Sequence, residues 1–149
     1  MEQRFVFWWW WLVAVTGAVL VFGLSMVVLP GPTQQLFNFI YLSSPHGSPI
    51  FGEAAGTYIK FISAVLGATM FGWSIALLYV LFGSFRRGQI EGWRTITVSV
   101  GAWFVPDTAY SLWSGFSQNA VLNIILLGMF VIPLAATFKT FKRPPNQAL

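Results

Sequence analysis

Cysteine is absent from the 149-residue sequence, and histidine occurs only once. The missing cysteine excludes disulfides, thiol redox chemistry and thiolate metal sites. Charged residues are also scarce at 8% of the chain, whereas roughly a quarter of the residues in a soluble domain are charged. A chain with 56% hydrophobic residues cannot cover its surface with polar groups as a soluble domain does. The composition therefore predicts an integral membrane protein.

Several enzyme signatures are missing as well. The sequence has no glycine-rich phosphate loop, no nucleophile elbow and no histidine pair for haem. The net charge of +4 does not indicate nucleic-acid binding, because the basic residues lie beside the ends of apolar runs rather than on one amphipathic face. The leading interpretation is a non-enzymatic protein with no nucleic-acid partner, since any reaction would have to take place inside a helical membrane core.

Long uncharged runs define the predicted fold. A helix of ~20 apolar residues crosses the ~30 Å hydrocarbon core of a bilayer. The first run, 5–29, is longer than the ~7–15 apolar residues of a secretory signal, so we expect it to remain as a membrane span. The stretch 95–138 is too long for one span, and its turn-rich segment 114–119 divides it into two. The predicted spans are approximately residues 5–29, 54–82, 92–114 and 119–138.

The predicted fold class is therefore all-α, a four-helix transmembrane bundle that forms a single membrane domain over residues 1–149. The outer loop 30–53 joins the first two spans, and its residues 33–42 predict a short amphipathic helix at the membrane interface. Small residues recur at multiples of four in the second span and predict close packing against a neighbouring helix. These residues are Gly56, Ala64, Ala68, Gly72 and Ala76.

Lysine and arginine set the predicted orientation. Arg4 precedes the first span, three arginines lie near the connection between the second and third spans, and the tail 139–149 carries the remaining basic residues but one. By the positive-inside rule, both termini and the middle connection are cytoplasmic, as in a protein of the bacterial inner membrane. Lys60 is the exception, because it lies about six residues into the second span from its outer end.

Lys60 and Asp107 are the two charges that this arrangement places inside the membrane. At the rise of an α-helix, Lys60 lies ~9 Å and Asp107 ~11 Å from the outer ends of their spans. An ionised group in a bilayer usually faces inward and pairs with another polar group. We therefore predict that Lys60 and Asp107 are neighbours or share a small polar cavity, with Ser111, Asn119 and Asn123 at the same depth.

This polar region has two interpretations, and neither holds if Lys60 instead extends its side chain to the outer headgroups. In the first, the Lys60–Asp107 pair and its amide neighbours only hold the helices in register. In the second, Lys60 holds an anionic or carbonyl head group, Asp107 tunes it or accepts a proton, and Trp73 and Trp103 line the site for an apolar tail. The ligand would be a bound lipid, a quinone or a pigment. His46 in the outer loop is either a further cofactor ligand or an ordinary solvated loop residue.

Three stretches carry a family resemblance: residues 61–73 (FISAVLGATMFGW), 103–108 (WFVPDT) and 119–123 (NAVLN). They resemble stretches of small uncharacterised bacterial membrane proteins, and the length and four-helix plan are similar to the DoxX-like group. That group offers no settled active site, so the resemblance assigns a role to no individual residue.

Two functional interpretations follow. In the leading one, the chain is a small accessory or scaffolding subunit that associates laterally with a larger membrane assembly or with itself. This interpretation rests on the high aromatic content and on the small part of the chain that would lie in water. In the alternative, the chain binds or modifies a lipid-like molecule, such as a quinone, a carotenoid or a sterol-like compound, in an outer-leaflet pocket around Lys60 and Asp107. Membrane lipids are partners in both.

Overall fold

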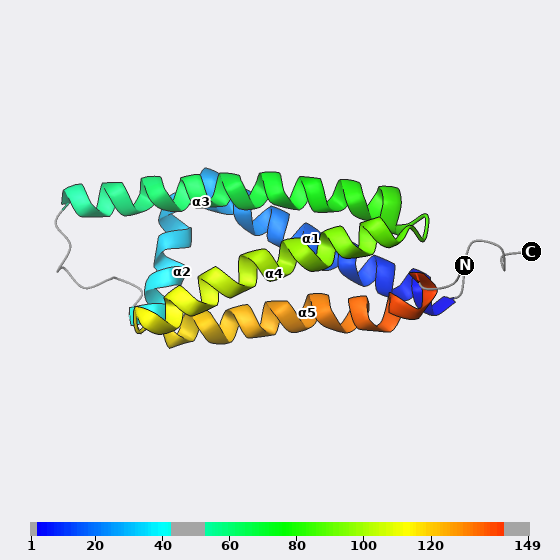
Figure 1. Cartoon of the computed structure of the whole chain (residues 1–149). Helices are drawn as coiled ribbons and strands as arrows, with labels where there is room; N and C mark the ends of the chain where they lie inside the picture. The colour runs from blue at the N-terminus through cyan, green and yellow to red at the C-terminus, as the bar shows by residue number, and fades with distance from the viewer. Residues whose placement is uncertain (1–2, 43–52, 142–149) are drawn as a thin grey trace, which may run out of the picture. The chain divides into compact units, whose positions relative to one another are not determined.

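The computed structural model describes residues 3–42 and 53–141, and all of its regular elements are helical (Figure 1). In chain order they are α1 (Gln3–Val28), α2 (Pro30–Leu42), α3 (Glu53–Val80), the short π-helix η1 (Leu81–Phe85), α4 (Ile90–Trp113) and α5 (Ser117–Phe141). The all-α prediction is thus confirmed for this part of the chain. His46 lies outside the described residues.

Three helices of the described part are long and apolar enough to cross a membrane: Gln3–Val28, Ala54–Phe85 and Ser117–Phe141, with 26, 32 and 25 residues. Each exceeds the ~20 residues that span the hydrocarbon core, which supports the membrane-protein prediction. The third predicted span coincides with α4, which is not among these three and is the least apolar of the four long helices. The fourth crossing therefore stays a prediction.

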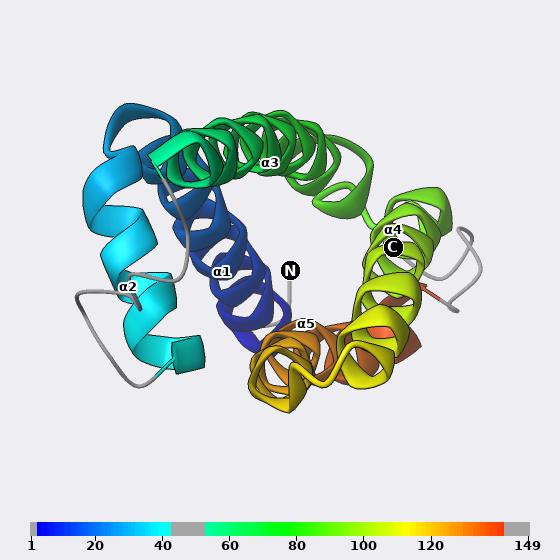
Figure 2. The ribbon, with the colours of Figure 1, turned by 90° about the vertical axis from the view of Figure 1, so that its left-hand side faces the viewer.

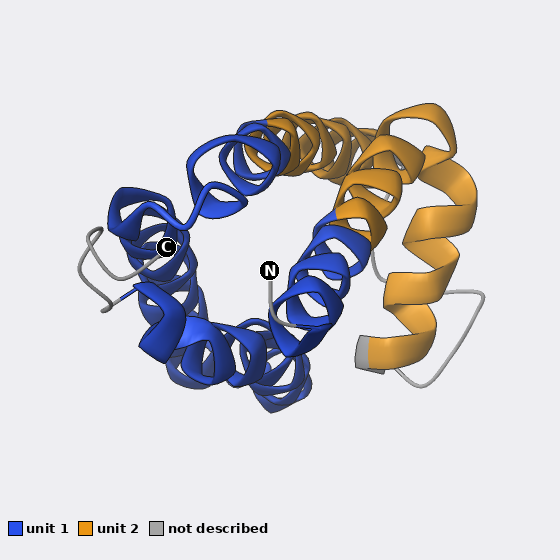
Figure 3. Cartoon of the chain, turned by 90° about the vertical axis from the view of Figure 1, so that its right-hand side faces the viewer, with its two compact units in different colours: residues 1–16, 76–149 blue, residues 17–75 orange. Residues whose placement is uncertain are grey.

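The chain divides into two compact units (Figure 3). Unit 1 comprises Met1–Thr16 and Ala76–Leu149, so it holds the start of α1, the end of α3, η1, α4 and α5. Unit 2 comprises Gly17–Ile75, with the rest of α1, α2 and most of α3. Both α1 and α3 therefore contribute one part to each unit.

In unit 2, the chain changes direction sharply between α1 and α2 (Figure 1). Pro30 opens α2, and the first turn of a helix tolerates proline because an N–H there has no helical partner. The hydroxyl of Thr33 donates a hydrogen bond of 2.9 Å to the Leu29 carbonyl. The rings of Phe22 and Phe37 meet edge to face at 6.1 Å. These contacts fix the change of direction between α1 and α2. The helix α2 includes the residues 33–42 that were predicted to form the amphipathic helix.

Two glycines bring α1 and α3 into backbone contact within unit 2. A Cβ on Gly23 would lie 2.8 Å from the Gly67 carbonyl oxygen, and a Cβ on Gly67 would lie 2.5 Å from the Gly23 carbonyl oxygen. Only glycine permits such an approach. The glycines of the predicted row of small residues do not make this contact, since a Cβ on Gly56 or Gly72 would meet nothing within 4 Å. A row spaced by four winds around a helix, and the residue that meets α1 lies outside it.

In unit 1, α4 and α5 form an antiparallel hairpin and lie side by side (Figures 1 and 2). Gly115 adopts a φ of 83° at the turn, a conformation that glycine reaches without steric cost. The end of α4 is closed by hydrogen bonds from the Phe116 N–H to the Ser111 carbonyl at 2.9 Å and from the Gly115 N–H to the Leu112 carbonyl at 3.3 Å. This Schellman pattern ends α4 sharply and fixes the register of the hairpin.

At the other end of the hairpin, three phenylalanine rings hold three helix ends together. Phe5 of α1 and Phe141 of α5 lie 5.9 Å apart between ring centroids, and Phe85 of η1 lies 4.8 Å from Phe141. All three side chains are buried. The start of α1, the end of η1 and the end of α5 therefore share one small aromatic core.

Tryptophan side chains of unit 1 also bind backbone carbonyls on other elements. The Nε1 atoms of Trp9, Trp11 and Trp93 donate to the carbonyls of Leu81, Met129 and Leu134 at 2.8, 3.0 and 2.8 Å, respectively. In addition, the Arg86 guanidinium lies 4.7 Å from the centroid of the Trp9 ring, a cation–π contact. The indoles thus stabilise unit 1 by hydrogen bonds, which are effective where apolar burial supplies no force between helices.

The bond from Trp11 has a specific cause in the sequence. Pro133 lies inside α5 and has no N–H, so the Met129 carbonyl, one turn earlier, lacks its helical donor. The indole of Trp11 supplies the missing donor from α1 at 3.0 Å. An unpaired carbonyl in an apolar medium is unfavourable, so Trp11 and Pro133 act as a pair.

We expect Trp11→Phe to lower the free energy of unfolding by about 1 kcal/mol, the net value of one hydrogen bond. In a Pro133→Ala background the new N–H at position 133 can bond the Met129 carbonyl, so Trp11→Phe should then cost much less. Unfolding in mixed detergent micelles, followed by circular dichroism, gives the four free energies of the cycle.

The matched control is Trp10→Phe, because Trp10 is 54% exposed, and it should be near neutral. An equal cost of Trp11→Phe in both backgrounds would show that the indole contributes by packing alone.

Candidate functional site

A polar cluster joins α4 to α5 near the hairpin turn. Nδ2 of Asn119 lies 3.0 Å from Oδ1 of Asp107 and 2.7 Å from Oγ of Ser111, and its two hydrogens can serve both acceptors. The Ser111 hydroxyl lies 2.7 Å from the Asp107 carbonyl and 3.3 Å from Oδ1. Since the hydroxyl has one hydrogen, the shorter distance favours the carbonyl. We call Asp107, Ser111 and Asn119 the hairpin cluster.

A second amide bond lies one turn further along α5. Nδ2 of Asn123 donates to Oγ1 of Thr108 at 3.2 Å. Asn123 is buried, as is Ser111 of the hairpin cluster. Thr108 is a site residue that was not predicted from the sequence. Its position directly after Asp107 was the one sequence feature that could have indicated it. The structure therefore brings together four of the predicted residues along one seam: Asp107, Ser111, Asn119 and Asn123.

The remaining predicted residues lie elsewhere. Trp103 is on α4, one turn before Asp107, and its ring meets that of Phe104 at 6.3 Å. Lys60 and Trp73 are on α3 within unit 2, where the Lys60 side chain is exposed. Asp107 belongs to unit 1, so the pairing of Lys60 with Asp107 stays a prediction.

The hairpin cluster is suited to positioning rather than to covalent chemistry. The groups that contact the Asp107 side chain are a hydroxyl and an amide, both neutral. Such donors orient a carboxylate but do not balance its charge. Among the described residues, no three histidine, cysteine or acidic side chains lie close enough together to hold a metal ion.

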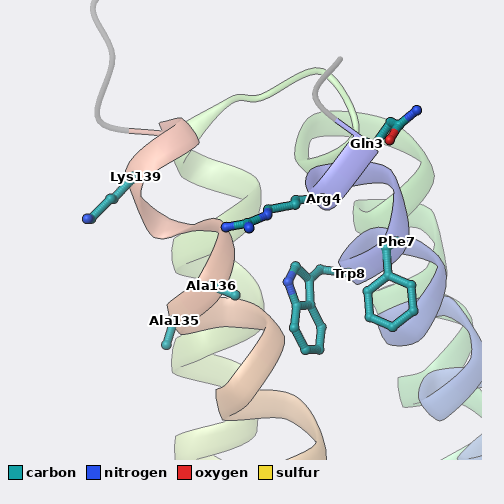
Figure 4. Close-up of a pocket in the computed structure, with 7 residues that line it drawn as sticks. All are labelled: Gln3, Arg4, Phe7, Trp8, Ala135, Ala136 and Lys139. Carbon is teal, nitrogen blue, oxygen red and sulfur yellow. The ribbon is translucent and has the colours of Figure 1, made fainter.

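An open cavity of about 780 Å³ lies at the opposite end of unit 1 (Figure 4). Its lining residues come from the start of α1 and the end of α5: Gln3, Arg4, Phe7, Trp8, Ala135, Ala136 and Lys139. We call it the terminal pocket. Of the lining residues that the structure describes, two are basic and none is acidic. The sequence indicated these basic residues only as markers of orientation, because nothing in it sets α1 beside α5.

No family model, no curated protein and no solved structure matches the chain. The resemblance to the DoxX-like group therefore stays a prediction.

We expect Asn119→Leu to lower the free energy of unfolding by about 1–3 kcal/mol, because it leaves the half-buried Asp107 carboxylate short of a donor. In an Asp107→Leu background the same change should cost less, since no carboxylate then remains to be bonded. Chemical unfolding in detergent micelles measures both.

Gln118→Leu is the matched control, because Gln118 is the exposed neighbour of Asn119 and should tolerate leucine. Equal effects at positions 118 and 119 would contradict a structural role for the cluster.

Proposed function

We propose that the chain is an integral membrane protein that crosses the bilayer four times, with both termini in the cytoplasm of a bacterial cell. In this proposal it is a non-enzymatic accessory or scaffolding subunit, and it contacts its partner at the level of Asp107 on the α4–α5 hairpin. The partner is another membrane protein or a second copy of the chain.

The hairpin supports the fourth crossing. α5 is long and apolar enough to span the membrane, and α4 lies antiparallel beside it. The 24 residues of α4 extend ~36 Å at the rise of an α-helix, which is longer than the ~30 Å hydrocarbon core. The turn at Gly115 is tight, and α4 and α5 pack against each other beyond it. If α5 crosses the bilayer, α4 lies in the hydrocarbon core beside it.

Asp107 is the observation that carries the subunit proposal. It lies about six residues before the end of α4, ~9 Å from the hairpin turn. Its side-chain contacts within unit 1 are neutral. An ionised carboxylate inside a membrane usually pairs with an opposite charge. A lysine or arginine on a neighbouring subunit would provide that charge and would direct lateral association to this level of the hairpin.

Large exposed side chains on the hairpin agree with this. Trp113 is 86% exposed and Val98 is 69% exposed, and the Trp113 ring contacts that of Tyr110. In the proposed membrane these side chains face lipid or a partner helix. By helical periodicity Trp113 and Val98 lie on other faces of α4 than Asp107, so they add apolar area to α4 that lipid or another helix can cover.

The alternative is a ligand site for a quinone, carotenoid or sterol-like molecule around Lys60 and Asp107. In that case the counter-charge comes from Lys60 of the same chain, and Trp103 lies on the Asp107 face of α4, four residues away. A co-purifying small molecule that disappears in Lys60→Met, while the fold survives, would favour this alternative over a protein partner.

The absence of cysteine makes the topology directly testable. We expect Gln118→Cys, at the hairpin turn, to react with a membrane-impermeant maleimide in intact cells. Gln89→Cys, at the other end of α4, should react only after the membrane is permeabilised. Both positions are exposed, so access to the reagent depends on the side of the membrane alone. Labelling of both positions from the same side would show that α4 does not cross.

The subunit proposal predicts that the wild-type chain leaves the membrane in mild detergent as a stoichiometric complex. Asp107→Asn should release it as a lone chain, because the counter-charge interaction is lost. Glu91→Gln, on an exposed acid at the other end of α4, should leave the complex intact. Native mass spectrometry measures the masses. Consistent isolation of the wild type as a lone chain would contradict the proposal.

A further inference from the structure

We propose that the terminal pocket binds the phosphate headgroup of an anionic phospholipid, such as phosphatidylglycerol. This inference rests on the proposed membrane arrangement, in which the start of α1 and the end of α5 lie at the cytoplasmic headgroup level. It concerns the opposite end of unit 1 from the hairpin cluster and a different ligand chemistry.

Charge is the first reason. Arg4 comes from the first turn of α1, and Lys139 comes from the last turn of α5. In Figure 4 the guanidinium of Arg4 extends from α1 toward α5, above the indole of Trp8, while Lys139 points outward from the rim. A guanidinium can bond two phosphate oxygens at once, and an ammonium adds a mobile point charge. Among the described residues no acidic side chain lines the pocket, so this part of its lining favours an anion.

The pocket wall is the second reason, and it favours a lipid over free phosphate. Below the cations the lining is apolar, formed by Phe7, Trp8 and two alanines of α5. In Figure 4, Ala136 points toward Trp8, and its small side chain leaves the space beside the indole open. A ligand that is anionic at one end and apolar at the other matches this gradient. Free phosphate would contact only the rim.

Contacts between α1 and α5 set the spacing of the two helices that line the pocket. Phe5 packs against Phe141, and Trp11 binds the Met129 carbonyl, so α1 and α5 are tied together on both sides of the Trp8 level. Arg86 is not among the lining residues, and its guanidinium already makes a cation–π contact with the Trp9 ring. The terminal pocket is therefore a fixed site between two helices, and it differs from a general basic surface.

The test uses the purified full chain in detergent, with native mass spectrometry counting bound phosphatidylglycerol against phosphatidylcholine of the same acyl chains. We expect wild type to retain phosphatidylglycerol preferentially. Arg4→Gln with Lys139→Gln should lower its binding constant about thirtyfold, because each basic side chain near an anionic lipid contributes about 1 kcal/mol. Ala136→Phe should reduce binding by a similar factor with every charge kept, because the ring fills the space beside Trp8.

The matched control is Arg87→Gln with Arg94→Gln, which removes two exposed charges near the start of α4, outside the pocket. An equal loss in this control, equal retention of phosphatidylcholine, or displacement of the lipid by millimolar inorganic phosphate would each overturn the inference. Alkaline carbonate extraction separates the two proposals. A chain stripped from the membrane contradicts the proposed function, whereas an integral chain whose pocket variants keep phosphatidylglycerol contradicts this inference alone.

Discussion

Backbone hydrogen bonding in an apolar medium is the constraint on which this structure depends. In a membrane no water satisfies an exposed carbonyl or N–H, so every irregularity of a helix needs a partner from the protein. Pro133 creates such an irregularity in α5, and the indole of Trp11 supplies the partner. At the π-helix η1 the backbone bond is kept, and the Leu81 carbonyl accepts the Trp9 indole in addition to the Arg86 N–H. Indoles of unit 1 thus join its helices at backbone carbonyls, and at Met129 the indole replaces a donor that the helix lacks.

The same constraint explains the hairpin cluster. Ser111 and Asn119 orient the Asp107 carboxylate and satisfy one of its oxygens, while the Gly115 turn fixes the register that brings α5 to it. Among the described residues the groups that contact the Asp107 side chain are neutral donors. In the proposed function this fixed carboxyl group is a point of contact for a neighbouring cation, from a partner or from Lys60.

The two ends of unit 1 have different chemistry. The hairpin end carries a carboxylate, amides and exposed aromatic side chains, and the other end carries arginine, lysine and tryptophan around an open cavity. In the two proposals, the hairpin end serves lateral association and the other end serves headgroup recognition. The two roles use separate residues, so a lipid at the terminal pocket would leave the hairpin end available to a partner.

The sequence by itself determined the helices and most of the polar seam. Uncharged runs and turn residues located α1, α3, α4 and α5, and the spacing of Asp107 and Ser111, with Asn119 just across a short turn, was enough to expect them together. Tertiary structure alone decided that Gly67 rather than the row spaced by four meets α1, that the indoles reach particular carbonyls, and that α1 and α5 enclose a pocket. The reason is that a residue's place along a helix follows from local spacing and hydropathy. The direction in which it faces a neighbour depends on how two helices rotate and cross, and only their packing sets that.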